Sequence, residues 1–162
     1  MANQGFKVLD SDMHIVEPWD LWEKWIDPEF RDRAPKCKHD YPTDLVGVEV
    51  EGKAIQDWRT EDNAEEANRI VAANIETEEE RVGRIPALQV AIERGFDPTS
   101  QLQAMDLEGI DVAVLFPSRG LSVMATDYQD TKLAAAVARA YNNWLAEFCQ
   151  ADPTRMYGAA MV

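Results

Sequence analysis

Residues 8–18 read V-L-D-S-D-M-H-I-V-E-P, an apolar stretch that carries two aspartates, a histidine and a glutamate. Its β-branched residues predict a strand over residues 6–16, which Pro18 ends. Asp12 and His14 lie near the carboxyl end of this strand and are two residues apart, so their side chains point to the same face. A carboxylate and an imidazole that converge on one point form half of a divalent-metal site.

A hydrogen-bonded pair without a metal would explain the Asp-X-His spacing equally well. Glu17 follows just beyond the strand, within reach of the same place, where it can act as a third ligand or orient the other two. The spacing alone leaves these alternatives open.

The residues after Pro18 predict a short amphipathic helix, because Trp19, Trp22 and Ile26 recur at helical spacing before Asp27-Pro28. Residues 30–60 are typical of loops, apart from one predicted hairpin. Its strands are residues 45–50 and 53–55, joined by Glu51-Gly52. Residues 61–81, rich in Glu and Ala, predict a solvated helix or a mobile insertion.

A helix is predicted after Asp97, which can cap it. The helix has Pro98 in its first position and Gly109 as its stop. Residues 110–116 then form a nearly continuous apolar run. Such a run is typical of a parallel strand that is covered on both faces. Residues 117–120, Pro-Ser-Arg-Gly, predict the loop after it.

The clearest predicted helix has Asp130 as its cap and ends at residues 152–153. Its apolar residues are spaced +4, +4, +3 and +4: Leu133, Val137, Tyr141, Trp144 and Phe148. A third strand is predicted from residue 156 to Val162. Strands that alternate with helices imply parallel pairing, so the fold class is α/β.

The predicted sheet has open apolar edges, which are an aggregation hazard in a free-standing domain. We therefore expect residues 1–162 to be the N-terminal part of one larger domain. It would hold about three β/α units of a (β/α)₈ barrel of the TIM type, with a variable insertion at about residues 28–94 after strand 1.

The composition narrows the classes of function. Hydrophobic residues make up 46% of the 162 residues, enough for a core. The formal net charge of -14 argues against binding to nucleic acid or to an anionic membrane surface. No apolar run approaches a membrane span and no signal peptide is visible, so a cytoplasmic location is expected. Cys37 and Cys149 lie far apart and fit reduced thiols.

Three segments resemble the amidohydrolase-related family, in the branch of metal-dependent decarboxylases of aminocarboxymuconate-semialdehyde and hydroxybenzoate type. The first is D-S-D-M-H-I-V-E-P at residues 10–18, followed by Asp-Leu-Trp at residues 20–22. The second runs from Gly95-Phe96-Asp97-Pro98 to residue 114. The third runs from Y-N-N-W at residues 141–144 to Gly158. The resemblance covers residues 6–27 and 95–162.

This resemblance implies a metal-dependent hydrolase or decarboxylase (a carboxy-lyase) with one divalent metal ion, zinc first and manganese as the alternative. The substrate would be a small molecule, carboxylated or aromatic. Asp12 and His14 would ligate the metal, with Glu17 as a third ligand or a residue that orients them. Arg119 follows strand 2 and would bind an anionic substrate. A surface or structural role is the competing interpretation of this arginine.

The chain departs from the family in two respects. Many relatives carry His-X-His on strand 1, whereas Asp12 stands first here. The resemblance also implies histidine ligands from the middle strands and a catalytic aspartate from strand 8, but no histidine follows His39. The expected acid or base therefore lies beyond Val162, no catalytic residue is expected within this chain, and the chain alone is expected to be inactive.

Two other functions stay open. One is a truncated, non-catalytic binding or assembly module whose exposed strands pair with a complementary chain. The other is a small metal-binding protein completed by homo-oligomerisation, in which Asp12 and His14 from two copies supply four ligands.

Overall fold

The computed structural model describes residues 5–37, 48–55, 90–91, 93–128 and 130–162. Its main sheet has three parallel strands in the order β1-β5-β6. The strands are β1 (Leu9–Ile15), β5 (Val112–Pro117) and β6 (Met156–Gly158). The predicted parallel α/β arrangement is confirmed, although β6 is shorter than the predicted strand.

Helix α5 (Pro98–Glu108) directly precedes β5 in the chain, and its ends are those that the sequence predicts. The Asp97 carboxylate accepts the Ser100 N–H at 2.7 Å, so the side chain caps the first turn. Gly109 has φ 75°, the left-handed conformation in which glycine ends a helix without strain.

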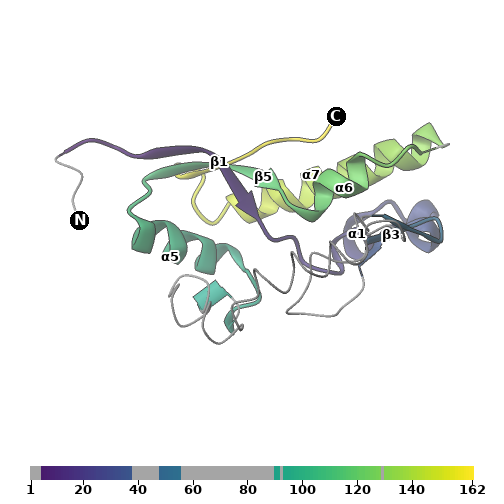
Figure 1. Ribbon diagram of the computed structural model, residues 1–162, viewed down its shortest axis with the longest axis horizontal. Helices are drawn as coiled ribbons and strands as arrows, with labels where there is room; N and C mark the ends of the chain where they lie inside the picture. Colours follow the sequence, from purple (N-terminus) through teal and green to yellow (C-terminus); the bar gives the residue numbers. More distant parts are fainter. Residues whose placement is uncertain (1–4, 38–47, 56–89, 92, 129) are drawn as a thin grey trace, which may run out of the picture.

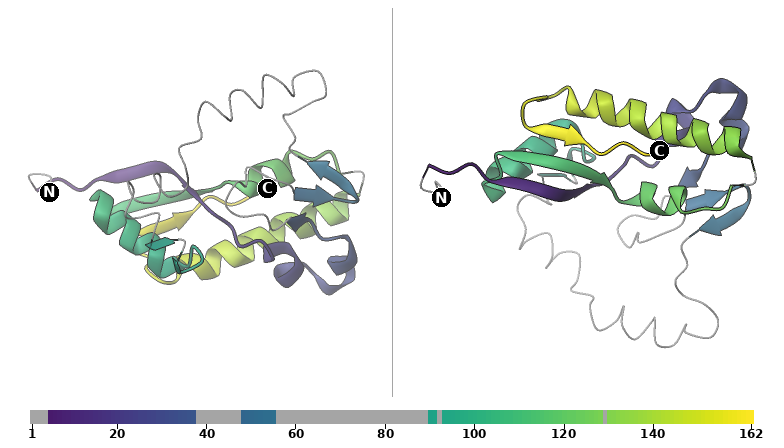
Figure 2. Two further views of the ribbon diagram at one scale, coloured as in Figure 1. Left: turned by 60° about the horizontal axis from the view of Figure 1, so that its bottom comes forward. Right: turned by 90° about the horizontal axis from the view of Figure 1, so that it is seen from above.

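Helix α7 (Thr131–Cys149) confirms the longest predicted helix and supplies much of the core. Asp130 caps it by accepting the Lys132 N–H at 2.9 Å. The predicted apolar stripe is buried, and Cys149 is buried with it, as expected. The helix packs against β6 and against α1 (Leu21–Trp25), the short helix predicted after Pro18. Figure 2 shows α7 lying alongside β6.

Two predicted loops are partly helical. Pro117–Gly120 was expected to be a loop, but α6 (Arg119–Met124) begins there. Residues from 30 onward were expected to be loop-like, but a 3₁₀ helix, η1 (Pro28–Arg33), occupies their start. The Glu17 carboxylate provides the physical reason for α6, since it accepts the N–H groups at the start of that helix.

A small antiparallel sheet consists of β2 (Lys36–Cys37), β3 (Val48–Val50) and β4 (Lys53–Ile55). The hairpin of β3 and β4 confirms the predicted one where residues are described. Its turn residues Glu51 and Gly52 both have positive φ, at 49° and 77°. The predicted helix at 61–81 lies outside the described residues, and so does His39.

The main sheet has one covered and one open face. Ala113, Leu115 and Met156 on the covered face are buried, and Met13 pairs with Leu115 and contacts Gln101 of α5. The open face has His14 beside Phe116. Leu9 of β1 and Tyr157 of β6 are 61% and 51% exposed.

Several elements gather at the carboxyl end of the strands. Figure 1 shows α1, β3 and α6 at that end of the molecule, whereas α5 lies at the other end with the N-terminus. Helix α6 packs against both β3 and α7. The residues that follow β1 and β5 therefore meet in one place. Among the described residues, no helix combines the length and the apolar character needed to cross a bilayer.

Candidate metal centre

A β-bulge lies next to the predicted metal ligands. Asp10 pairs with Ala113 and Met13 pairs with Leu115, so Ser11 and Asp12 together oppose a single residue of β5. The Asp12 N–H donates to the Asp10 carboxylate at 2.9 Å instead of to the sheet. Asp12 is thereby displaced from the regular ladder just before His14.

The imidazole of His14 has a fixed orientation. Its Nδ1 lies 2.7 Å from the carbonyl oxygen of Pro117, at the end of the neighbouring strand. A carbonyl oxygen can only accept, so Nδ1 carries the proton and donates it. In the neutral imidazole, Nε2 then keeps its lone pair. A hydrogen bond from one ring nitrogen to a backbone carbonyl is how proteins commonly prepare the other nitrogen for a metal.

Asp12 and His14 converge, with Asp12 Oδ1 at 3.9 Å from His14 Nε2. Their side chains are 76% and 47% exposed, so both donor atoms are accessible from solvent. Bonds to zinc of roughly 2.0–2.2 Å allow two donors to be at most about 4.2 Å apart when they share one ion. The pair therefore fits two positions of a divalent-metal site.

The described residues do not include a group of three side chains that could hold a metal ion. A catalytic zinc usually has three protein ligands, so the pair is a partial site. Metal ligation by Asp12 and His14 stays a prediction, supported by their geometry.

Glu17, the predicted third ligand, lies in a different environment. Its side chain is completely buried, and its carboxylate accepts the N–H groups of Ser118, Arg119 and Gly120 at 3.0, 2.9 and 2.9 Å. Burial raises the pKa of the Glu17 carboxyl, against the smaller lowering effects of these hydrogen bonds and of the Arg119 charge. The carboxylate thus caps α6, and the structure does not bring it together with Asp12 and His14.

Arg119, the predicted substrate-binding residue, contacts the same glutamate. Its guanidinium Nη1 donates to the backbone carbonyl of Glu17. An arginine has five N–H donors, so this contact does not exhaust its capacity. The side chain is half-buried at the carboxyl end of β5. Substrate binding by Arg119 stays a prediction.

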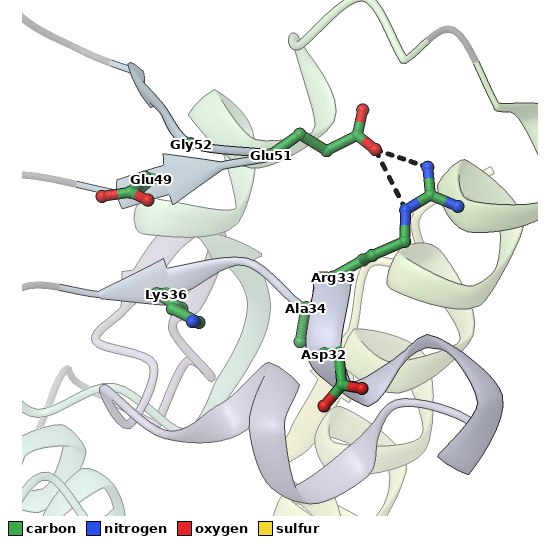
Figure 3. Close-up of a pocket in the computed structure, with 7 residues that line it drawn as sticks. All are labelled: Asp32, Arg33, Ala34, Lys36, Glu49, Glu51 and Gly52. Carbon is green, nitrogen blue, oxygen red and sulfur yellow. Dashed lines mark hydrogen bonds and ion pairs between the residues drawn. The ribbon is translucent and has the colours of Figure 1, made fainter.

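Sequence reasoning missed two features of this region. The first is the Pro117 carbonyl that orients His14, which has no sequence signal because every residue carries a carbonyl. The second is a cavity of about 190 Å³ beside the hairpin (Figure 3). Its lining residues are Asp32, Arg33, Ala34, Lys36, Glu49, Glu51 and Gly52.

Arg33, an arginine that lines this cavity, already forms ion pairs with two carboxylates. Arg33 donates to Glu51 from Nε at 3.1 Å and also from Nη2, and it reaches Asp130 at 2.7 Å (Figure 3 shows the Glu51 pair). These contacts join η1, the hairpin turn and the start of α7. They raise the pKa of the Arg33 guanidinium, chiefly through the hydrogen bonds to Glu51 and Asp130. The arrangement is that of a structural tie between three elements.

Comparison with known proteins finds likenesses to solved structures. No family model and no curated protein sequence matches the chain. Among solved structures, the chain is similar to an amidohydrolase from Mycobacterium avium subsp. paratuberculosis K-10, with a TM-score of 0.60 and 17% sequence identity. The match covers 98% of this chain and 43% of that one, so this chain spans less than half the length of the solved structure. The likeness concerns the fold: the chain has an α/β fold similar to part of that structure.

Proposed function

We propose that the chain supplies the first-strand part of the active site of a metal-dependent hydrolase or decarboxylase of the amidohydrolase superfamily. The observation that carries the proposal is the prepared donor pair. The Pro117 carbonyl holds Nδ1–H of His14, and Nε2 faces Asp12 Oδ1 at 3.9 Å. The likeness in fold to an amidohydrolase supports it, as does the position of the pair at the carboxyl end of a parallel strand.

In this proposal the surrounding domain is a (β/α)₈ barrel, of which β1, β5 and β6 are the first three strands. The helix-covered face of the sheet would be its outside, and the open face with His14 and Phe116 would line its interior. The remaining ligands and the acid or base would come from strands that follow in such a barrel.

Asp12 and His14 would hold the ion, with zinc as the first expectation and manganese as the alternative. A divalent ion bound there would polarise a substrate oxygen or lower the pKa of a bound water molecule. Other features of the chain orient these two ligands. Pro117 fixes the histidine tautomer, and the bulge at Asp12 directs the carboxylate towards Nε2.

A small carboxylated substrate suits this end of the sheet. Arg119 lies at the start of α6, directly after β5, and its planar guanidinium can bind a carboxylate with two N–H groups. One of its donors already contacts the Glu17 carbonyl, which holds the side chain at the end of β5. The aromatic ring of Phe116, 6.4 Å from the His14 ring, would suit an aromatic substrate.

Calorimetric titration of the purified chain with Zn²⁺ tests the proposal. We expect one site that is weakened at least tenfold by Asp12→Asn and by His14→Gln, because each change removes one of the two donors. Asp127→Asn is the matched control, since Asp127 is exposed, and His39→Gln controls for the second histidine. Equal Zn²⁺ affinity in all variants would contradict the proposal.

A second candidate function is a non-catalytic assembly module. The outer strands β1 and β6 carry Leu9 and Tyr157, both more than half exposed, and exposed strand edges are sites for pairing with another chain. Sedimentation velocity over a range of concentrations tests the homo-oligomeric form of this candidate. Self-association that Leu9→Lys abolishes would favour it, and a monomer at every concentration would contradict it.

A further inference from the structure

A single peptide group joins His14 to Glu17. The carbonyl of Pro117 accepts Nδ1–H of His14 at 2.7 Å, and the N–H of the same peptide bond, which belongs to Ser118, donates to Glu17 Oε1 at 3.0 Å. The order is therefore carboxylate, peptide group, imidazole. His14 and Glu17 do not touch through their side chains, yet both are bound to the two ends of one planar unit.

We propose that Glu17 is a positioning residue for His14, which acts through the Pro117–Ser118 peptide group to hold the histidine in its Nδ1–H tautomer. The inference rests on the proposed function for its purpose, since this tautomer leaves Nε2 for the ion. The arrangement resembles the carboxylate–histidine pairs that orient metal ligands, with a peptide group inserted between the two partners.

The electrostatics favour this role. A carboxylate that accepts a peptide N–H polarises the peptide group, and the carbonyl at its other end becomes a stronger acceptor. The effect is largest where solvent is excluded, and the Glu17 side chain is completely buried. The stronger carbonyl then favours a proton on Nδ1 over one on Nε2.

The geometry also fixes the plane of the peptide. Glu17 Oε1 accepts from both Ser118 and Gly120, and Oε2 accepts from Arg119, so three successive N–H groups point at one carboxylate. A peptide group held in this way cannot rotate without losing its bond to Oε1. The direction of the Pro117 carbonyl, and with it the His14 ring, is set by Glu17.

Gly120 keeps the space that the carboxylate needs. A Cβ at position 120 would first meet the methyl group of the flexible Met161 side chain, which would have to shift, and it would lie 2.9 Å from Pro117 Cβ and 3.0 Å from Glu17 Oε1. Gly120→Ala therefore disturbs the same unit by steric contact and leaves the charge of Glu17 in place. The chain thus offers two independent ways to perturb the peptide group.

The test is long-range ¹H–¹⁵N spectroscopy of the histidine-labelled, metal-free chain. The sequence has only two histidines, which keeps the spectrum simple. The measurement is made at about pH 8.5, where histidine side chains are ordinarily neutral. We expect His14 to be almost entirely in the Nδ1–H tautomer in the wild-type chain, and to shift towards a mixture in Glu17→Gln and in Gly120→Ala.

Two controls separate positioning from general stability. Glu147→Gln makes the same chemical change at an exposed site of α7 and is expected to leave the tautomer unchanged. Val137→Ala removes two buried methyl groups of α7 remote in sequence from the peptide group, and it is expected to lower the melting temperature without changing the tautomer.

Three results would overturn the inference. They are a wild-type chain with both tautomers equally populated, a tautomer that Glu17→Gln leaves unchanged, and an equal shift in Val137→Ala. Where neither Glu17→Gln nor Gly120→Ala folds, the wild-type spectrum and the exchange rate of the Ser118 amide proton decide. A rapidly exchanging Ser118 amide would contradict its bond to Glu17.

Titration with Zn²⁺ then connects the inference to the proposed function. Loss of an orienting partner commonly weakens metal binding by about 10–100-fold, and we expect a loss in this range for Glu17→Gln. A wild-type chain that keeps the Glu17-dependent tautomer but binds no Zn²⁺ would contradict the proposed function alone. Tight Zn²⁺ binding with a tautomer independent of Glu17 would contradict this inference alone.

Discussion

The buried carboxylate of Glu17 holds the backbone that follows β5, because it accepts three successive N–H groups there. Replacement by Gln keeps the size of the side chain but leaves one oxygen for three N–H donors, and it turns an amide group towards a peptide N–H. A buried donor without an acceptor costs about 1–3 kcal/mol. We expect Glu17→Gln to lower the free energy of unfolding by this amount in a urea titration at neutral pH.

Glu147→Gln is the matched control for that measurement, because the side chain at 147 is exposed. Its effect should stay within about 0.5 kcal/mol, the usual range for surface substitutions. A loss for Glu17→Gln no larger than that of the control would contradict the capping role of the carboxylate.

Tyr141, unlike Glu17, has a buried polar group without a hydrogen-bond partner among the described residues. Its ring is fully buried, and the polar group is the hydroxyl. Burial raises the pKa of the Tyr141 phenol, and the charge of Glu17 raises it further, so the group stays neutral. We expect Tyr141→Phe to leave the free energy of unfolding unchanged or to increase it, because the substitution removes a buried polar atom that makes no bond.

Calorimetric melting of Tyr141→Phe beside the wild-type chain measures this effect. Tyr157→Phe, at an exposed position of β6, is the comparison. A Tyr141→Phe chain that loses more than about 1 kcal/mol would show that the hydroxyl makes a stabilising hydrogen bond.

At the scale of elements, α5 depends on its N-terminal cap. The Asp97 carboxylate accepts the Ser100 N–H at 2.7 Å and pairs with Arg94. Asp97→Ala should cost about 1 kcal/mol, whereas Asp97→Asn should cost less, because asparagine is an equally good cap. Urea midpoints of the two variants measure the difference, and equal losses would assign the effect to the Arg94 pair instead of the cap.

The helices show which elements the sequence can predict. Both α5 and α7 carry their own signals, an aspartate cap at one end and a stop at the other, within a few residues of the helix. Helix α6 has no such signal. Its first N–H groups are accepted by Glu17, which lies 101 to 103 residues earlier in the chain, so a local pattern could not indicate it.

The sequence likewise predicts only part of the candidate site. The spacing of Asp12 and His14 is local, and it is enough to predict that two donors lie on one face of a strand. The β-bulge, the Pro117 carbonyl and the displacement of Glu17 towards α6 all depend on how β5 pairs with β1. Side chains can be anticipated from spacing, but the backbone groups that orient them arise only from the tertiary register.

Across the whole molecule, three aspartates make the fold sensitive to acid. The pKa of each carboxyl is lowered, that of Asp97 mainly by Arg94, that of Asp130 mainly by Arg33 and that of Asp152 mainly by Thr154. A carboxyl with a lowered folded pKa contributes stability above its unfolded value of about 3.9, and this contribution is lost as the pH falls through the folded pKa.

We therefore expect stability to decrease as the pH falls below about 4, and Asp97→Asn to reduce the steepness of that decrease. Urea midpoints from neutral pH to about pH 2 measure the slope. A wild-type chain with the same midpoint throughout this range would contradict the assigned ion pairs.

The open face of the sheet and the donor pair on it support the proposal that this chain binds a divalent ion through His14 Nε2. The most direct measurement is the ¹⁵N spectrum of the two histidines during a titration with Zn²⁺. We expect the Nε2 signal of His14 to shift on binding, Nδ1 to keep its proton on the Pro117 carbonyl, and Asp12→Asn to weaken the response. A shift at His14 Nδ1, a response confined to His39, or no response at either histidine would contradict it.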